Sequence, residues 1–383
     1  MAKIREIRIH VLAHTLAEPF QSSFSTFTER RACLVEIATD DGLTGWGECL
    51  GPAGPNAATV DAMAQRIIGW DASRIEAIWQ HLFVEFRDQG PRGITITALS
   101  GIDIALWDLA GKRAGLPVHA LMGASFRQDV PAYATGGFRK LAGDRAARTA
   151  EEAANYVDEG FGAVKIKIGY GVAEDLSAIE AVRAAIGAET ALMIDANHGY
   201  DAIEAIELAR GAAAFDIGWF EEPIVPEDLA GYREIRRAQP IPVAAGETWH
   251  TRWAFRDALV DRCVDIVQPD VCGTGGLTEA RKIADLASAF HIRVVPHVWG
   301  SGIAVAAALQ FLATLPPAPT RHAAREPMLE FDRTDNPFQK AALKAPIVPE
   351  NGRVSIPDGP GLGIEVDIDG LSRFAAAPAI SRS

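Results

Sequence analysis

Polar and apolar positions alternate near the start of the chain in a pattern that predicts antiparallel strands. Residues 3–12 alternate, and two further apolar runs, 32–39 and 43–48, flank the dipeptide Asp41-Gly42. Asp-Gly between two such runs favours a tight hairpin turn. The first fifty residues are therefore predicted to form a small antiparallel sheet.

The spacing of apolar residues becomes helical between residues 56 and 115. In the last part of this stretch, Leu99, Ile102 and Leu106 fall at i, i+3 and i+7, which places them on one helix face. Gly115 and the proline that follows it are predicted to end this helix. The first segment therefore combines strands and helices, as an α+β domain.

From about residue 128 the chain shows short, nearly continuous apolar runs, each ending in a polar residue and separated by helix-like stretches. The residues that end successive runs are Lys167, Asp195, Glu221, Glu247, Asp270 and His297. From Asp195 onward the intervals between these ends are 26, 26, 23 and 27 residues. A strand and helix unit of about 25 residues, repeated with buried parallel strands, predicts a TIM-like β/α barrel.

These differences in the pattern of apolar and polar residues divide the chain into three predicted segments. Residues 1–127 form the N-terminal part of an α+β capping domain, and residues 128–336 form the barrel that carries the catalytic residues. Residues 337–383 are rich in Pro and Gly before they alternate again, and they are predicted to return to the capping domain.

Composition excludes some classes of partner. The chain has 383 residues, 48% of them hydrophobic, and a net charge of −13. A large core is therefore possible, while nucleic acid and anionic membranes are poor partners for so acidic a protein. The four cysteines show no CxxC spacing and are predicted to be reduced thiols. With no signal-type segment or apolar span recognised, we expect a cytoplasmic protein.

Three carboxylates end successive predicted strands: Asp195, Glu221 and Glu247. Such residues lie at one mouth of a barrel, where three acids side by side would repel one another unless a cation binds among them. Ligands that are all oxygen favour a hard ion, so the sequence predicts a Mg²⁺ site. Any one of these acids taken alone is more often a helix cap or a surface charge, and the metal site is predicted from the three together.

Asp270 and His297 end the next two strands, which lie about 5 Å apart in a sheet. A carboxylate bonded to one ring nitrogen fixes the tautomer of the histidine and increases the basicity of the other nitrogen. These two residues are predicted to act as a pair in proton transfer.

Lys165 and Lys167 lie two residues apart in one strand, so their side chains point to the same face. Lys167 needs a neutral amine to act as a base, and a second ammonium together with a nearby divalent cation would lower its pKa. Lys165 would also be placed to bond a substrate carboxylate. The reaction that these groups predict is removal of a proton α to a carboxylate, with the resulting charge stabilised by the cation and an ammonium.

The same residues resemble the enolase superfamily, and specifically its mandelate racemase subgroup. The resemblance rests on K165-I-K167, MIDAN, WFEEP, AAGET, QPD and VPHVWGSG, and it covers nearly the whole chain. It implies a (β/α)₇β barrel with an α+β capping domain built from both termini. It also implies cap loops near residues 18–24, 51–56 and 86–93 that close over a small sugar acid or its lactone.

The resemblance further implies substrate-binding residues and an assembly. A glutamate at the last strand best matches Glu330, with Glu326 as the competing choice, and Asn197 is expected to contact the substrate as well. Members of the family often form homo-oligomers, so a dimer or an octamer is expected. The implied reaction is α-proton removal followed by β-elimination, with opening of a sugar-diacid lactone to a 3-deoxy-2-keto-hexarate favoured.

Several alternatives stay open at this point. An aldarate or aldonate dehydratase shares the first step and differs in the group that leaves, and a racemase or epimerase would reprotonate the same carbon. A zinc hydrolase would need paired histidines at an early strand, which the sequence lacks. A catalytically silent sugar-acid-binding protein would tolerate loss of a base, yet Lys165, Lys167, Asp270 and His297 are all present.

Overall fold

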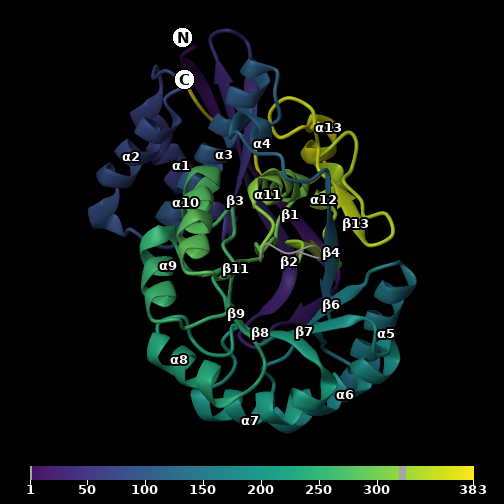
Figure 1. The fold of residues 1–383 in the computed structure, drawn as a ribbon. Coiled ribbons are helices and arrows are strands. Elements are labelled where there is room, and N and C mark those ends of the chain that lie inside the picture. The colour runs from purple at the N-terminus through teal and green to yellow at the C-terminus, as the bar shows by residue number, and fades with distance from the viewer. Residues whose placement is uncertain (1, 319–324) are drawn as a thin grey trace.

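The computed structural model describes residues 2–318 and 325–383, which form a cap and a barrel (Figure 1). In Figure 1 most of the purple and blue N-terminal segments and the yellow C-terminal segment lie in the upper part, and the teal strands and helices of the barrel lie below. This architecture confirms the predicted fold class, a β/α barrel with an α+β capping domain.

The cap contains an antiparallel sheet in the order β14-β1-β2-β3. Its strands are Ile380–Arg382 (β14), Ile4–Gln21 (β1), Thr26–Thr39 (β2) and Thr44–Cys49 (β3). Pairing of β14 with β1 brings the end of the chain back to the cap, whereas β13 (Arg353–Ser355) pairs with the first barrel strand. The segment after residue 337 therefore contacts both parts of the molecule.

The hairpin formed by β1 and β2 is longer than the alternation predicted. The residue pattern predicts a strand that ends near Leu12 and a loop over residues 18–24, but β1 continues to Gln21 and Phe20 still pairs with Phe27 on β2. A short strand of the cap sheet, β5 (Arg139–Lys140), pairs with this end of β1. These cross-strand bonds extend the hairpin where the local residue pattern is no longer that of a strand.

The cap helices pack on one another and on the sheet. Their bounds are Ala53–Ile67 (α1), Ile75–Glu85 (α2), Arg87–Gln89 (η1), Ile94–Ala114 (α3) and Val118–Leu121 (α4). By length and composition alone α3 is apolar enough to cross a membrane, but 78% of that window is buried inside the protein. Such burial is typical of the core helix that α3 forms against β2 and β3.

Close approach of α3 to β3 depends on glycine. A Cβ atom added at Gly47 would lie 2.0 Å from the carbonyl oxygen of Gly101 on α3. We therefore expect Gly47→Ala to lower the free energy of unfolding by about 3 kcal/mol, because backbone cannot yield as a flexible side chain does. Urea unfolding followed by circular dichroism measures this. Gly54→Ala is the matched control, since a Cβ there meets nothing within 4 Å and favours helix α1.

Within residues 2–318 and 325–383, eight parallel strands form the barrel sheet, in the order β11-β10-β9-β8-β7-β6-β4-β12. Their bounds are Asp129–Gly136 (β4), Ala163–Lys167 (β6), Ala191–Asp195 (β7), Ile217–Glu221 (β8), Val243–Ala245 (β9), Ile266–Val267 (β10), Arg293–Val294 (β11) and Leu329–Asp332 (β12). At the seam between β11 and β12, the backbone N–H of Val298 donates to Glu330 Oε2 at 3.1 Å. A side chain at the active mouth therefore helps to join the two ends of the sheet.

Helices connect the strands in the alternation that the sequence predicts. In the part of the chain that the structure describes, they are Arg145–Asp158 (α5), Val172–Ile186 (α6), Ala202–Ala212 (α7), Leu229–Ala238 (α8), Thr251–Val260 (α9), Gly276–Ala289 (α10) and Gly302–Thr314 (α11). Shorter pieces are Ala213–Phe215 (η2), Phe338–Ala341 (α12) and Ile368–Ser372 (α13). Every residue of α11 is buried, as expected for an apolar helix between cap and barrel.

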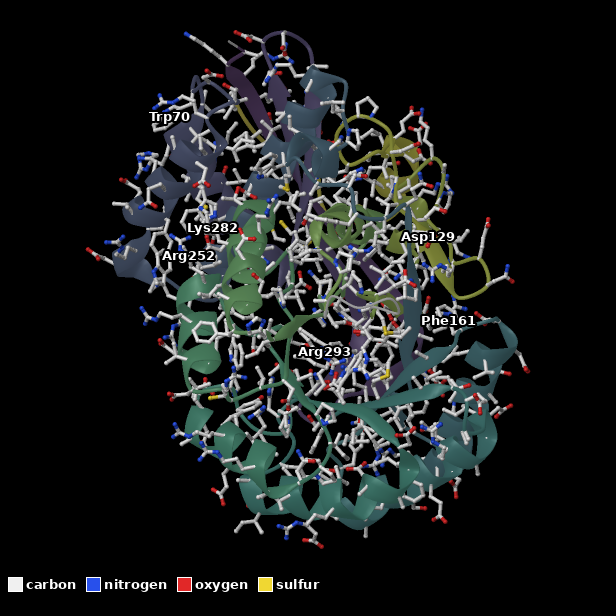
Figure 2. All side chains as sticks on the ribbon, viewed as in Figure 1. Trp70, Asp129, Phe161, Arg252, Lys282 and Arg293 are labelled. Carbon is white, nitrogen blue, oxygen red and sulfur yellow. The ribbon has the colours of Figure 1, made fainter. Side chains whose placement is uncertain are left out.

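Contacts along one side join cap helix α2 to barrel helices α9 and α10. Figure 2 labels Arg252 on α9 and Lys282 on α10, both on the side of the barrel that faces α2. Lys282 Nζ donates to Glu76 of α2 at 2.8 Å, and Trp79 Nε1 of α2 donates to the carbonyl oxygen of Gly275 at 2.8 Å. The turn that leads into α10 is thus bonded directly to the cap.

An apolar layer closes the interior of the barrel beneath the polar residues. It contains Tyr133, Ala163, Met193, Trp219, Ala244, Ile266 and Val295. Because strand side chains alternate between faces, the residue two positions further along points to the same side, one layer nearer the C-terminal mouth. That next layer includes Thr135, Lys165, Asp195, Glu221, Gln268 and His297. The alternation within each strand therefore places polar side chains directly above an apolar floor.

Candidate active site

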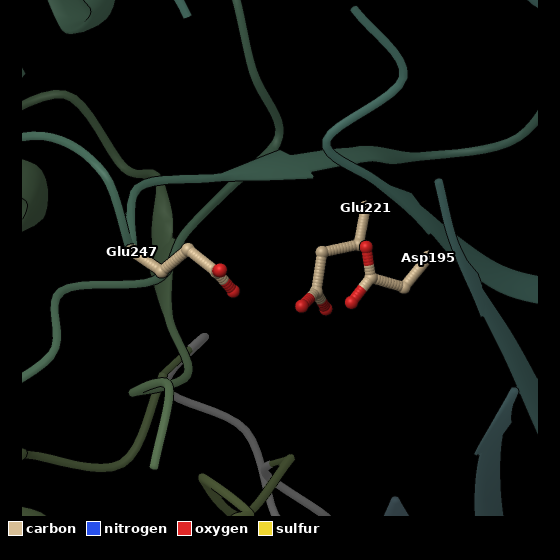
Figure 3. A group of neighbouring side chains, drawn as sticks. All are labelled: Asp195, Glu221 and Glu247. Carbon is tan, nitrogen blue, oxygen red and sulfur yellow. The ribbon is translucent and has the colours of Figure 1, made fainter. Parts of the chain in front are cut away.

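The three predicted metal ligands come together at the mouth of the barrel. Asp195, Glu221 and Glu247 each offer one carboxylate oxygen, and these oxygens lie within 4.8 Å of one another. Figure 3 shows Glu247 facing the other two carboxylates from the neighbouring strand end. Glu247 Oε2 is buried and has no hydrogen-bond partner among the described residues, although His297 Nε2 lies 3.2 Å away. An all-oxygen group with an unsatisfied buried oxygen fits a hard divalent cation.

Two side chains fix the orientation of Glu221. Trp219 Nε1 and Gln268 Nε2 both donate to Glu221 Oε2, at 2.9 and 2.6 Å. Lys165 donates to the other oxygen. Burial raises the pKa of Glu221 to about 7, with Lys165 acting in the opposite direction and Asp195 adding to the rise.

Both lysines of β6 point into the site and are buried. Lys165 Nζ lies among three carboxylates. It is bonded to Glu221, it lies 2.8 Å from Glu330 Oε1, and it lies 3.5 Å from Asp195 Oδ2. Lys167 Nζ donates to Asp195. The shared direction that strand alternation predicts for the two side chains is what the structure has.

The pKa of Lys167 moves upward among the protein's own groups. Burial and Lys165 lower this pKa, but Asp195, together with Glu247 and Glu221, raises it by more. The sequence predicts a lowered pKa for Lys167 that depends on Lys165 and on a divalent cation. Lys165 acts in the expected direction, but it does not outweigh Asp195, so a neutral Lys167 needs the additional positive charge.

Asp270 and His297 form a hydrogen-bonded pair. His297 Nδ1 lies 2.7 Å from Asp270 Oδ2, and the backbone N–H of Cys272 donates to Asp270 Oδ1 at 2.6 Å. The second ring nitrogen, Nε2, lies 3.2 Å from Glu247 Oε2, beside the carboxylate group. Burial lowers the pKa of His297, but Glu247, Glu330 and Asp270 outweigh it and raise the pKa to about 10.

Glu330, rather than Glu326, lies in the site. Besides Lys165, its carboxylate accepts a hydrogen bond from Thr135 Oγ1 at 2.7 Å. Burial raises the pKa of Glu330, but Lys165 and His297 lower this pKa by more than burial raises it, to about 2. Glu326 instead pairs with Arg353 at the surface, at 2.8 Å. Contact of Glu330 with substrate stays a prediction.

Asn197 follows β7 with a positive φ of 41°, which turns the chain sharply after Asp195. Its backbone N–H donates to Asp195 Oδ1 at 2.9 Å, and its side-chain amide lies 3.4 Å from Glu222 Oε2. Ser23, in the turn between β1 and β2, donates to the carbonyl oxygen of Asn197 at 2.7 Å. The cap therefore reaches the end of β7, and substrate contact by Asn197 stays a prediction.

Sequence reasoning did not single out Trp219, Gln268 or Thr135, although each bonds a predicted site residue. A signal was available, because Trp219 precedes Glu221 by two residues and Gln268 precedes Asp270 by two. Strand alternation places such residues on the inner face. Two further tryptophans near strand ends have different surroundings. Trp249 packs edge-on against Phe255, while Trp299 lies against Phe138 and under the guanidinium of Arg30.

Comparisons with known proteins show the family of the chain. Residues 4–123 match the model "Mandelate racemase / muconate lactonizing enzyme, N-terminal domain", and residues 148–370 match "Enolase C-terminal domain-like". D-galactarolactone cycloisomerase of Agrobacterium fabrum is 55% identical over 372 residues, 97% of this chain and 98% of that protein.

Solved structures show the same similarity. The 3,6-anhydro-D-galactonate cycloisomerase from Zobellia galactanivorans superposes with a TM-score of 0.89 at 40% identity, covering 98% of this chain and 100% of that one. A racemase from Streptomyces coelicolor with bound magnesium has a TM-score of 0.87 at 31% identity, covering 97% and 100%. The chain belongs to the mandelate racemase and muconate lactonizing enzyme family of the enolase superfamily.

Proposed function

We propose that this enzyme removes the proton α to the carboxylate of a sugar-diacid lactone and expels the β-oxygen, as a D-galactarolactone cycloisomerase. The product would be a 3-deoxy-2-keto-hexarate. The observation that carries the proposed chemistry is the meeting of a lysine pair and an Asp–His pair around three carboxylates. The choice of substrate rests on the 55% identity to the cycloisomerase of Agrobacterium fabrum.

The three carboxylates would hold Mg²⁺. The unsatisfied oxygen of Glu247 and the all-oxygen ligand set support this ion. When bound, Mg²⁺ supplies a positive charge that binds the substrate carboxylate and stabilises the negative charge that develops there. The same charge would compete with Lys167 for Asp195 and with His297 for Glu247.

The chain's own residues would divide the proton transfers. Lys167 stands at the end of β6 and His297 follows β11, with four strands between them in the sheet. The two bases would therefore approach the α-carbon from different sides, one removing the proton and the other acting in a later transfer. Lys165 would donate a hydrogen bond to the substrate carboxylate, held in place by Glu221 and Glu330.

A direct assay separates this proposal from its rivals. Galactarolactone and linear galactarate are each incubated with the enzyme and Mg²⁺ in D₂O, and loss of the α-proton is followed by proton NMR. We expect the lactone to open to the keto diacid. Faster turnover of linear galactarate would instead establish a dehydratase, and α-exchange without elimination would establish a racemase or epimerase. The homo-oligomeric state and the cytoplasmic location stay predictions.

A further inference from the structure

Two buried carboxylates of the cap bind the barrel just beyond the Asp270–His297 pair. Glu48 lies on β3 and is 3% exposed, and Asp103 lies on α3 and is 1% exposed. Burial raises the pKa of each to about 7, although the hydrogen bonds that they accept act in the opposite direction. Carboxylates buried in this way disfavour folding near neutral pH, so their bonding partners explain their presence better than stability does.

Glu48 binds the N-terminus of α11. Its carboxylate accepts hydrogen bonds from the backbone N–H of Ser301 at 3.0 Å, from Ser301 Oγ at 2.6 Å and from the backbone N–H of Ala304 at 3.1 Å. Ser301 is the N-cap residue of this helix and follows His297 by four residues. A carboxylate here satisfies free backbone donors and complements the positive end of the helix dipole.

Asp103 does the same for α10. The N-cap residue of that helix is Gly275, which has no side chain to accept a hydrogen bond, and Asp103 Oδ2 accepts from the backbone N–H of Thr278 at 3.0 Å instead. A Cβ added at Gly276, where φ is +81°, would lie 2.2 Å from Asp103 Oδ2. Glycine at this position therefore leaves room for Asp103 of the capping domain to accept the hydrogen bond that a side chain at the helix N-terminus would otherwise accept.

The turn between Asp270 and α10 is bonded to the cap at both ends. Cys272 donates its backbone N–H to Asp270 Oδ1, and its carbonyl oxygen accepts from the backbone N–H of Leu50 at 3.0 Å. At the other end, Gly275 N–H donates to Ser100 Oγ of α3 at 2.8 Å. The position of the Asp270 carboxylate thus depends on the cap as well as on the barrel.

Lys167 is held differently. Its carbonyl oxygen accepts a hydrogen bond at 3.1 Å from Arg145 of α5, and Arg145 pairs with Asp175 of α6 at 2.6 Å. Both partners belong to the barrel. A disturbance at the cap carboxylates would therefore displace one of the two candidate bases and leave the other in place.

We infer that Glu48 and Asp103 are positioning residues, through which the cap fixes the Asp270–His297 pair by capping helices α11 and α10. Among the described residues, their hydrogen bonds go to the N-termini of α11 and α10 and not to the lysines, the three carboxylates or His297. The inference goes beyond the proposed function, because it concerns how the pair is held and not which sugar acid reacts.

The test uses the full chain with Mg²⁺ and the variants Glu48→Gln and Asp103→Asn. In protein labelled with ¹⁵N-histidine, the Nδ1 proton of His297 is assigned by its loss in His297→Asn. We expect a downfield, exchange-protected signal in the parent and exchange at least about tenfold faster in both variants. The matched control is Asp108→Asn. Asp108 is also buried in α3, but its carboxylate accepts hydrogen bonds from the backbone N–H groups of Trp46 and Leu362. The His297 signal of the Asp108→Asn variant should therefore match that of the parent.

A kinetic arm runs beside the NMR arm. For a sugar acid whose α-proton exchange is abolished by His297→Asn, both variants should lower kcat by about 100-fold with KM changed less than about threefold. The inference would be overturned if Glu48→Gln or Asp103→Asn melted as a folded protein and kept the parent's His297 signal and Nδ1 proton exchange rate. Losses of the same size in Asp108→Asn would also overturn it. Failure of the parent to act on any sugar acid would overturn the proposed function alone, since the NMR signal needs no substrate.

Discussion

Replacing Lys167 with alanine is expected to lower the rate of the proton transfer that its amine performs by about 100- to 10,000-fold, the range that general acid–base groups contribute. His297→Asn is expected to do the same for the transfer that the imidazole performs. The physical reason is that both side chains are buried at the carboxylate group, where water cannot readily replace them as bases. Deuterium exchange across a panel of sugar acids, followed by NMR, measures both variants.

The two variants also show which base acts first. Loss of the base that takes the first proton should suppress exchange at the α-carbon. Loss of the other base should preserve this exchange and block a later step. Lys282→Ala is the matched control for Lys167→Ala, because Lys282 pairs with Glu76 on the outer surface. This variant should catalyse α-proton exchange at the parent rate. Exchange that survives in both Lys167→Ala and His297→Asn would rule out the assigned bases.

Replacing Glu247 with glutamine should weaken Mg²⁺ binding by about 100-fold, or about 2.8 kcal/mol. Glu247 is the sharpest choice among the three acids. Glu221 and Asp195 each pair with a lysine, so their replacement would leave a buried ammonium without its partner. Isothermal titration calorimetry with Mg²⁺ measures the affinity directly.

Thermal unfolding distinguishes loss of the metal from loss of the fold. Without added cation, Glu247→Gln should be about as stable as the parent, because the loss of repulsion from two neighbouring carboxylates offsets the loss of the contact with His297. At a Mg²⁺ concentration about 100 times Kd, only the parent should gain about 2.7 kcal/mol of stability. Glu326→Gln is the control, since Glu326 pairs with Arg353 at the surface. Equal Mg²⁺ stabilisation of parent and Glu247→Gln would remove Glu247 from the ligand set.

Some features of the site could be anticipated because they depend on neighbouring residues along the chain. Strand alternation fixes the shared direction of Lys165 and Lys167, and the regular interval between strand ends places Asp195, Glu221 and Glu247 at one mouth of a barrel. The length of the β1–β2 hairpin could not be anticipated in the same way. It depends on pairing with β5, which lies more than a hundred residues further along the chain.

The sequence alone determined which residues could do chemistry, the type of element that carries each, and the barrel that gathers them, because local periodicity encodes all three. Only the tertiary structure decided which of those groups bond one another. It selected Glu330 over Glu326, gave Lys167 a carboxylate that raises its pKa, and placed Glu48 against a helix that begins some 250 residues later. Such contacts depend on how the cap docks on the barrel and how the sheet curls, and no local pattern of polar and apolar residues specifies either.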